Sequence, residues 1–180
     1  MAYYFLKDII RLKLGKSDHI NKLNKRVLGC VQCRLHETRK NAVPGEGNIQ
    51  SDLMIIGQAP GKEEDREGKM FLGPSGEILD RLFTDLGLTR KEFYMTNMLK
   101  CFLPKSRKPR QDEIDTCIQL YLFNEINLVN PKVLIPLGYH CTKMIFRRYN
   151  LPVPDRHHFP ELFGKMFVAK NRKILPLRHP

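Results

Sequence analysis

Short apolar runs, each ending at a glycine or an asparagine, alternate with helical patterns along most of this 180-residue chain. Three of these runs predict strands, namely Leu53–Gly57 (LMIIG), 93–96 before Asn97, and 132–137 before Gly138. Continuous apolar runs of this length are typical of buried parallel strands. Because helices are expected between the strands, the pattern predicts an open α/β sheet, which binds its ligands at the carboxyl ends of the strands.

Helices are expected on both sides of these strands. Apolar periodicity and capping residues predict helices over 3–14, 18–29, 74–86, 111–128 and 139–149, with the first two joined at Gly15–Ser17. A final pair of strands is predicted over 166–169 and 173–177. We expect the third helix to bury one apolar face, composed of Ile78, Leu79, Leu82, Phe83 and Leu86. The chain shows no internal repeat and no clear domain boundary, so residues 1–180 are expected to form a single domain.

Four residues or segments that directly follow predicted strands are candidates for a ligand site. They are 57–60, Asn97, Gly138 and His179. The carboxyl ends of parallel strands share one edge of a sheet, so we expect these segments to meet at one cleft.

Cysteine spacing indicates a second centre. Cys30 and Cys33 form a C-V-Q-C pair, and Cys101 and Cys117 follow far downstream. Soft thiolates from distant chain positions suit a metal or an iron–sulfur cluster, although a redox pair, half a zinc site and ordinary buried cysteines stay open. Cys141 lies in a predicted helix and is expected to be a small buried apolar residue.

The charge balance favours a polyanionic partner. The chain has 31 Lys and Arg against 19 Asp and Glu, a net charge of +12. Neutralising phosphates releases counterions, which favours nucleic acid over a merely soluble basic surface. No apolar run approaches the ~18 residues of a membrane span. The N-terminal segment mixes charges with apolar residues, unlike a signal peptide, so a reducing, cytoplasmic location is expected.

The chain resembles the family 4 uracil-DNA glycosylases from about residue 27 onward. The matching segments occur in the same order and spacing: CVQCRLHETR (30–39), VPGEGN (43–48), LMIIGQAPGKEED (53–65), GKMFLGPSG (68–76), YMTNMLKC (94–101), Cys117 and VLIPLG (133–138).

The resemblance implies a three-layer α/β/α fold around a four-stranded, mostly parallel sheet. It implies a [4Fe-4S] cluster on Cys30, Cys33, Cys101 and Cys117, which would hold loops together. It also implies a monomer that releases uracil from DNA and leaves an abasic site. No lysine is evidently placed to form a Schiff base, which indicates a monofunctional glycosylase without a lyase step.

The resemblance also assigns roles to substrate-binding residues. Phe71 would stack on the flipped uracil, and the Asn97 amide would read its edge. Ala59, Pro60 and Gly61 would shape the backbone so that an N–H approaches the base oxygen, and Gly57 is a further substrate-binding candidate. His179 would donate a hydrogen bond to uracil O2 and stabilise the departing anion.

Gln58 departs from the family pattern, in which Glu usually occupies this position. A Glu could activate water or stabilise a cationic sugar, whereas Gln58 can only orient water. Since N-glycosidic cleavage is largely dissociative, we expect altered activity at Gln58 rather than none. The neighbouring residues Glu63, Glu64 and Asp65 are expected to cap the loop or to face solvent.

DNA contacts are expected from basic residues near the cysteine loops. The candidates are Arg34, Arg39, Lys40, Lys105, Arg107, Lys108 and Arg110. The family normally continues after the His-Pro pair with a loop that enters the minor groove and a final helix, so the C-terminal part of the family domain is expected to be missing here.

Two alternative functions stay open. Gln58 and the position of His179–Pro180 are compatible with a catalytically weak or inactive relative that binds uracil or DNA. An iron–sulfur electron carrier is the weaker alternative.

Overall fold

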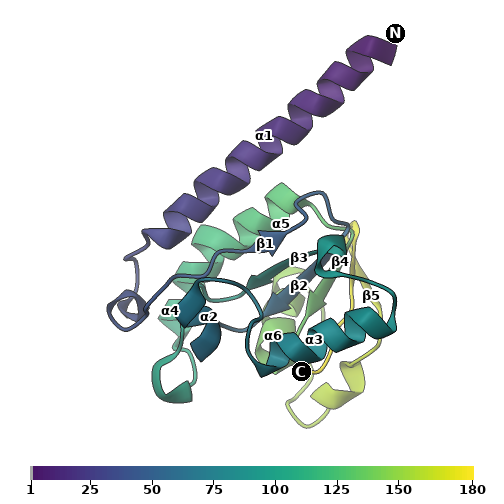
Figure 1. The fold of residues 1–180 in the computed structure, drawn as a ribbon. Coiled ribbons are helices and arrows are strands. Elements are labelled where there is room, and N and C mark those ends of the chain that lie inside the picture. Colours follow the sequence, from purple (N-terminus) through teal and green to yellow (C-terminus); the bar gives the residue numbers. More distant parts are fainter. Residues whose placement is uncertain (1) are drawn as a thin grey trace.

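The apolar runs form the centre of a six-stranded sheet in the computed structural model, which describes the backbone of residues 2–180 and the side chains of 15–105 and 107–180 (Figure 1). The strand order is β1-β3-β2-β4-β6-β5. The four central strands are parallel: β3 (Phe93–Asn97), β2 (Leu53–Gly57), β4 (Val133–Pro136) and β6 (Arg172–Ile174). Two short antiparallel strands extend the edges, β1 (Glu46–Gly47) and β5 (Phe167–Ala169). The predicted mostly parallel α/β sheet is therefore confirmed, but it has six strands rather than four, because β1 and β5 extend its two edges.

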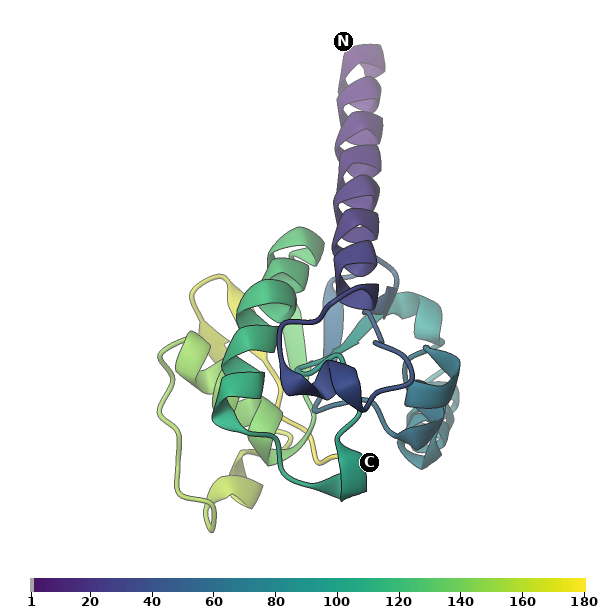
Figure 2. The ribbon, with the colours of Figure 1, turned by 90° about the vertical axis from the view of Figure 1, so that its left-hand side faces the viewer.

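Helices cover both faces of the sheet and give three layers (Figures 1 and 2). Met54 and Ile56 of β2 project from one face of the sheet. On this face they share a core with residues of α5 (Phe123–Val129) and α6 (Gly138–Arg148). The intervening Ile55 points to the opposite face, where it belongs to the same cluster as residues of α3 (Pro74–Asp85). Side chains alternate between the faces of a strand, so an entirely apolar strand serves both layers.

The first helix differs from the prediction. Instead of two helices joined at Gly15–Ser17, the structure has one helix, α1 (Ala2–Leu28). A helical glycine costs only about 1 kcal/mol relative to alanine, which does not end a helix. Ile20, Leu23 and Val27 anchor the carboxyl-terminal half of α1 in the core, and the opposite end extends beyond the body (Figures 1 and 2). In the described part of the chain, no helix combines the length and the apolar character needed to cross a membrane.

The predicted long helix that carries Cys117 forms as one helical run with an irregular middle. It consists of α4 (Gln111–Cys117), a π-helical turn η4 (Ile118–Leu122) and α5. The connections contain one short α-helix, α2 (Lys62–Glu67), and the 3₁₀ turns η1 (Arg34–Glu37), η2 (Arg90–Glu92), η3 (Pro104–Ser106) and η5 (Phe159–Leu162). A π-turn often marks a functional position, and this one directly follows a predicted ligand cysteine.

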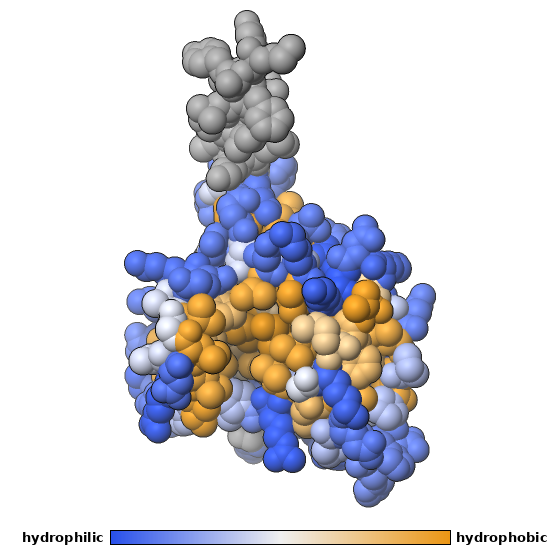
Figure 3. Space-filling model, turned by 90° about the vertical axis from the view of Figure 1, so that its right-hand side faces the viewer, coloured by the Kyte–Doolittle hydropathy of each residue, from blue (hydrophilic) through white to orange (hydrophobic). Residues whose placement is uncertain are grey.

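The apolar face predicted for α3 is only half buried. Leu79 and Phe83 lie in the core, whereas Leu82 is 49% exposed and Leu86 is 71% exposed. The apolar face of α3 is therefore wider than the part of the helix that the sheet covers. Figure 3 views the side of the molecule on which α3 and β5 lie, and apolar side chains cover much of its middle.

Candidate functional site

Four strand ends meet at one edge of the sheet, as the sequence predicts. Gly57 at the end of β2 is in register with Asn97 at the end of β3. Beyond β4 and β6, Leu137 pairs with Leu177, and the Gly138 N–H donates to the Leu177 carbonyl at 2.8 Å. This parallel register brings His179 to the same edge as the other candidates.

A cavity of about 260 Å³ lies at this edge. Four of the predicted residues line it together, namely Ala59, Phe71, Asn97 and His179, with Glu64 and Ser75 among the others. Small-molecule sites typically range from about 300 to 1,000 Å³, so this cavity is slightly smaller than that range. It suits one planar base better than a whole nucleotide.

Gly57 allows the amide and the aromatic ring to approach each other. A Cβ at this position would lie 2.3 Å from Asn97 Oδ1 and 3.2 Å from Phe71 Cζ. Asn97 is itself 3% exposed, and its Nδ2 lies 3.5 Å from the Met70 sulfur. Any side chain at position 57 would displace the amide, so glycine is required by this close approach.

Phe71 has a strained backbone that its neighbours hold in place. Its φ is +50°, an uncommon value for an aromatic residue. Arg90 Nη2 donates to its carbonyl at 2.6 Å, and Gly76 leaves room for that carbonyl, since a Cβ there would lie 1.8 Å away. On the other side, Glu64 Oε1 accepts the N–H groups of Leu72 and Gly73 at 2.7 and 2.8 Å. Strain of this kind persists only where the surroundings enforce it.

Glu64 is a cavity residue to which the sequence analysis assigned no substrate contact. It was expected to cap a loop or face solvent, and the structure confirms the capping. It is also only 6% exposed and lines the cavity beside Phe71. Nothing in the acidic run distinguishes this buried carboxylate from its half-buried neighbour Glu63.

Gln58 and His179 occupy different positions relative to the cavity. Gln58 is half-buried, its carbonyl accepts the Leu99 N–H at 2.9 Å, and it is absent from the described cavity lining that includes its neighbour Ala59. His179 lies in the lining, and its Nδ1–H donates to the Pro180 carbonyl at 2.9 Å. With the proton on Nδ1, only the charged imidazolium of His179 can donate through Nε2.

A buried ion pair supports the end of β3. Lys100 Nζ lies 2.6 Å from Glu125 Oε2, and the two side chains are 1% and 0% exposed. The same ammonium donates to the Asn97 carbonyl at 3.1 Å and to Thr96 Oγ1 at 2.5 Å. Thr96 in turn donates to Glu125 at 2.7 Å. The pair therefore ties the backbone of Asn97 to α5.

The four predicted ligand cysteines lie around one small cavity. Cys30, Cys33, Cys101 and Cys117 all line it, together with Leu35, Leu99 and Tyr121. All five cysteines of the chain are free thiols. Across the described residues, no group of three or more His, Cys, Asp or Glu side chains is arranged to hold a single metal ion.

Burial and one arginine set the electrostatics of these thiols. Burial raises the pKa of Cys117 to about 12, and burial also raises the pKa values of Cys33 and Cys101. Arg39 Nη1 opposes this effect at Cys101 by donating to its sulfur at 3.1 Å. Arg39 also donates to the Cys30 carbonyl at 2.7 Å, so it links two of the cysteine loops. Cys141 is fully buried, as predicted.

The predicted DNA-contact residues are divided between ion pairs and open surface. Arg34 pairs with Asp112 at 2.8 Å, and Arg107 pairs with the buried Glu113 at 2.6 Å. Lys105, Lys108 and Arg110 are exposed. Their contact with phosphate stays a prediction.

Comparison with known proteins shows which family this sequence matches. The model of the uracil DNA glycosylase superfamily matches residues 44–180. A type-4 uracil-DNA glycosylase of Saccharolobus solfataricus is 43% identical over 168 residues, which cover 91% of this chain and 76% of that protein. Type-4 uracil-DNA glycosylases of Sulfurisphaera tokodaii and Archaeoglobus fulgidus are 36% and 30% identical, cover 91% of this chain, and are themselves covered over 74% and 82%.

The Lys100–Glu125 pair is expected to contribute strongly to folding. Lys100→Met leaves a buried carboxylate without its cation, which should lower the free energy of unfolding by about 3–5 kcal/mol. Replacing both residues, as in Lys100→Met with Glu125→Leu, should recover part of this loss, because both charges then disappear. Urea unfolding measures both effects.

The exposed pair of Lys132 and Asp52 provides the control, since its side chains are 76% and 56% exposed. Lys132→Met should cost less than about 1 kcal/mol. Equal losses for Lys100→Met and Lys132→Met would contradict the importance assigned to the buried pair.

Proposed function

This chain belongs to the uracil DNA glycosylase superfamily, and we propose that it hydrolyses the N-glycosidic bond of deoxyuridine in DNA, releasing uracil and leaving an abasic site. The observation that carries the proposal is the single cavity lined by Phe71, Asn97 and His179. A ring, an amide and an imidazole around one small slot suit recognition of one extruded pyrimidine.

Each of these side chains would act at a different part of the base. The Phe71 ring would stack on the uracil, and base–aromatic stacking is worth about 1–3 kcal/mol. The Asn97 amide offers a donor to O4 and an acceptor to N3–H, and cytosine presents the opposite pattern. His179 would donate to O2 as negative charge develops on the departing base.

The reaction exchanges one bond for another. The bond from C1′ to N1 breaks, and uracil leaves with the electron pair. The oxygen of a water molecule then bonds to C1′, and its released proton balances the charge of the uracil anion. Gln58 would orient this water by hydrogen bonding, since an amide cannot remove the proton as a carboxylate can.

We also propose that Cys30, Cys33, Cys101 and Cys117 hold a [4Fe-4S] cluster. Support comes from the convergence of four thiols on one cavity and from the Arg39 N–H groups directed at this region. Each thiolate of such a cluster binds its own iron, so the thiols need not surround one point. The cluster would fasten the turn after α1 to the loop after β3 and to the end of α4.

The alternative of an inactive uracil-binding relative gains no support from the comparisons. The three relatives named above are described as glycosylases, and the cavity retains the three predicted base-contacting residues. Gln58 therefore modifies a proposed activity rather than arguing against it.

The activity is tested on an end-labelled oligonucleotide that contains one deoxyuridine. We expect strand cleavage only after alkali treatment, which breaks abasic sites, and no cleavage of the thymidine control. Phe71→Ala should lower kcat/KM by about 10- to 100-fold, the equivalent of a lost base stack. Phe163→Ala removes a partly exposed ring outside the cavity lining and should leave the rate unchanged. A wild-type protein that produces no alkali-labile sites would refute the function.

Substitution of Gln58 tests its proposed role. Gln58→Glu should raise kcat on the same substrate by about 10-fold or more, because a carboxylate can act as a base and stabilise the cationic sugar. Gln50→Glu adds the same charge at an exposed position and should not change the rate. An equal or lower rate for Gln58→Glu would show that this position does not limit the chemistry.

The cluster is tested by analysis of the purified protein. We expect iron and acid-labile sulfide in equal amounts with broad visible absorbance, and Cys117→Ser should lose most of both. Cys141→Ala should retain them, because this thiol is buried elsewhere in the core. Zinc in place of iron, or full retention of iron by Cys117→Ser, would overturn this assignment.

A further inference from the structure

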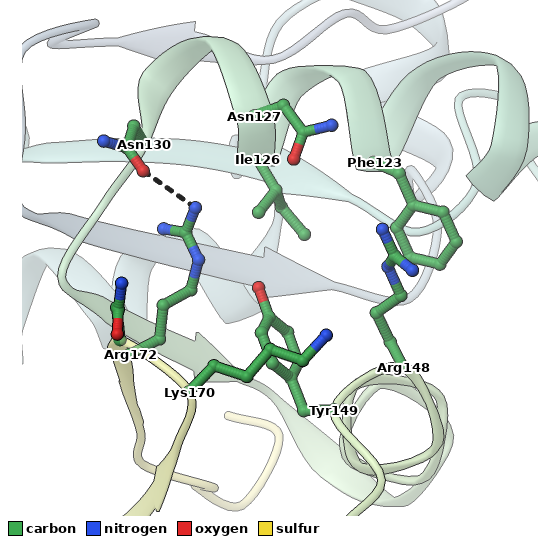
Figure 4. Close-up of a pocket in the computed structure, with 9 residues that line it drawn as sticks. Phe123, Ile126, Asn127, Asn130, Arg148, Tyr149, Lys170 and Arg172 are labelled. Atoms are coloured by element: carbon green, nitrogen blue, oxygen red, sulfur yellow. Dashed lines mark hydrogen bonds between the residues drawn. The ribbon is translucent and has the colours of Figure 1, made fainter.

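Two neighbouring cavities lie along α6, outside the site described above. The first, of about 280 Å³, lies between α5, the end of α6 and the turn that joins β5 to β6 (Figure 4). The second, of about 340 Å³, lies between α6 and the α4–η4 segment. Both are lined by Phe123 and Arg148, so they adjoin each other at this stacked pair, and we call them together the α6 groove.

Positive charge dominates the α6 groove. Its described lining contains one acid, Asp115, and five Lys and Arg side chains: Lys143, Arg147, Arg148, Lys170 and Arg172. His140 also lines the groove, and its pKa is lowered, first by burial and then by the nearby charges of Arg156, Lys143 and Lys108. Such a furrow attracts a chain of phosphates.

The groove also offers apolar and aromatic surfaces. The Arg148 guanidinium lies 4.7 Å from the centroid of the Phe123 ring. Figure 4 shows Arg148, Tyr149 and Arg172 pointing into the same space beneath α5. Met98, Ile118 and Met144 line the second cavity. Met98, Ile118 and Met144 are themselves buried, whereas the rings of Phe123 and Tyr149 are partly exposed. A basic groove with partly exposed aromatic rings is an arrangement by which proteins bind single-stranded nucleic acid.

Helix α6, which lines the groove, begins beside the proposed uracil slot. α6 starts at Gly138, where a Cβ would lie 3.3 Å from the Cβ of His179, and His140 lies in its first turn. The helix has 11 residues and is therefore about 16 Å long at 1.5 Å per residue. The helix thus runs from the slot edge of the sheet toward the opposite edge, where Lys170 and Arg172 lie.

Not all of these cations are needed for folding. Arg172 donates to Asn130 Oδ1 at 2.9 Å and to the Pro131 carbonyl, so it has a structural role at the end of α5. Arg147 and Lys170 are exposed and take part in no ion pair among the described side chains. Arg147 and Lys170 are therefore the residues of the groove that can bind a phosphate without losing an ion pair.

We propose that the α6 groove binds a single-stranded segment of DNA that flanks the target nucleotide. This inference rests on the proposed glycosylase function, because it extends the DNA path beyond the slot. The rings of Phe123 and Tyr149 beside the cations favour a single strand, whose bases are free to stack, over a duplex. The groove adjoins the predicted contacts at Lys108 and Arg110, since Gln111 lines it and Lys108 lies near His140, but its own cations belong to α6 and the β5–β6 hairpin.

The test measures binding of thymidine oligonucleotides, which lack uracil, by fluorescence anisotropy at several salt concentrations. The groove variant is Arg147→Gln with Lys170→Gln. The control variant is Arg81→Gln with Lys91→Gln, which removes the same charge from exposed positions in α3 and η2.

The groove variant should bind a long single strand about 10-fold more weakly at low salt, and its slope of log K against log salt should shrink by about 1.4, the value for two lost phosphate contacts. Its kcat on a uracil oligonucleotide with very short flanks should be unchanged, which also shows that it folds. Equal losses for both variants, or an unchanged slope, would overturn the proposal. An equal loss on a blunt duplex would overturn the single-strand assignment. Because binding is measured without uracil, failure here leaves the glycosylase assay as an independent result.

Discussion

Lys100 and Glu125 form an ion pair in the interior, and both centres of the molecule adjoin it. Lys100 donates to the Asn97 carbonyl, and its neighbour in the chain is Cys101. Glu125 also accepts the Gly45 N–H at 3.2 Å, which attaches the loop before β1. Taking two charges out of water is costly unless their hydrogen bonds are satisfied, and here each charged group has more than one partner. The pair thus fixes one strand end between the slot and the cysteine cavity.

The position of the four cysteines suggests how they support the proposed uracil slot. The strand ends bring Gly57, Asn97 and His179 to one edge, but the segments between them are loops and short helices. The cysteines lie on three such segments, after α1, after β3 and at the end of α4. A cluster there would hold the segments together without taking part in bond cleavage, in a chain of only 180 residues.

Much of the fold could be predicted from the sequence because apolar runs define parallel strands directly. β2, β3 and β4 lie within one or two residues of the predicted positions, and the four segments that follow the strands do converge. The resemblance supplied the candidate residues Phe71 and Asn97, which share the cavity. The continuity of α1 through Gly15 was missed, since a glycine was treated as a break.

Other parts could not be predicted because they depend on tertiary contacts of charged groups. The sequence analysis singled out neither Lys100 nor Glu125, because nothing in the sequence shows that they meet each other and their polar partners in the interior. Glu64 gave the same signal as Glu63, although it alone accepts backbone N–H groups within the cavity wall. The exposure of Leu82 and Leu86 likewise depends on how much of α3 the sheet covers.

The left-handed backbone of Phe71 has a thermodynamic consequence for recognition. A residue held in such a conformation costs about 1–3 kcal/mol, and this cost is met when the protein folds, through Arg90, Glu64 and the space left by Gly76. The ring is then preorganised, so an arriving base need not immobilise a mobile loop. More of the stacking energy is therefore left to compensate for extruding the nucleotide from its helix.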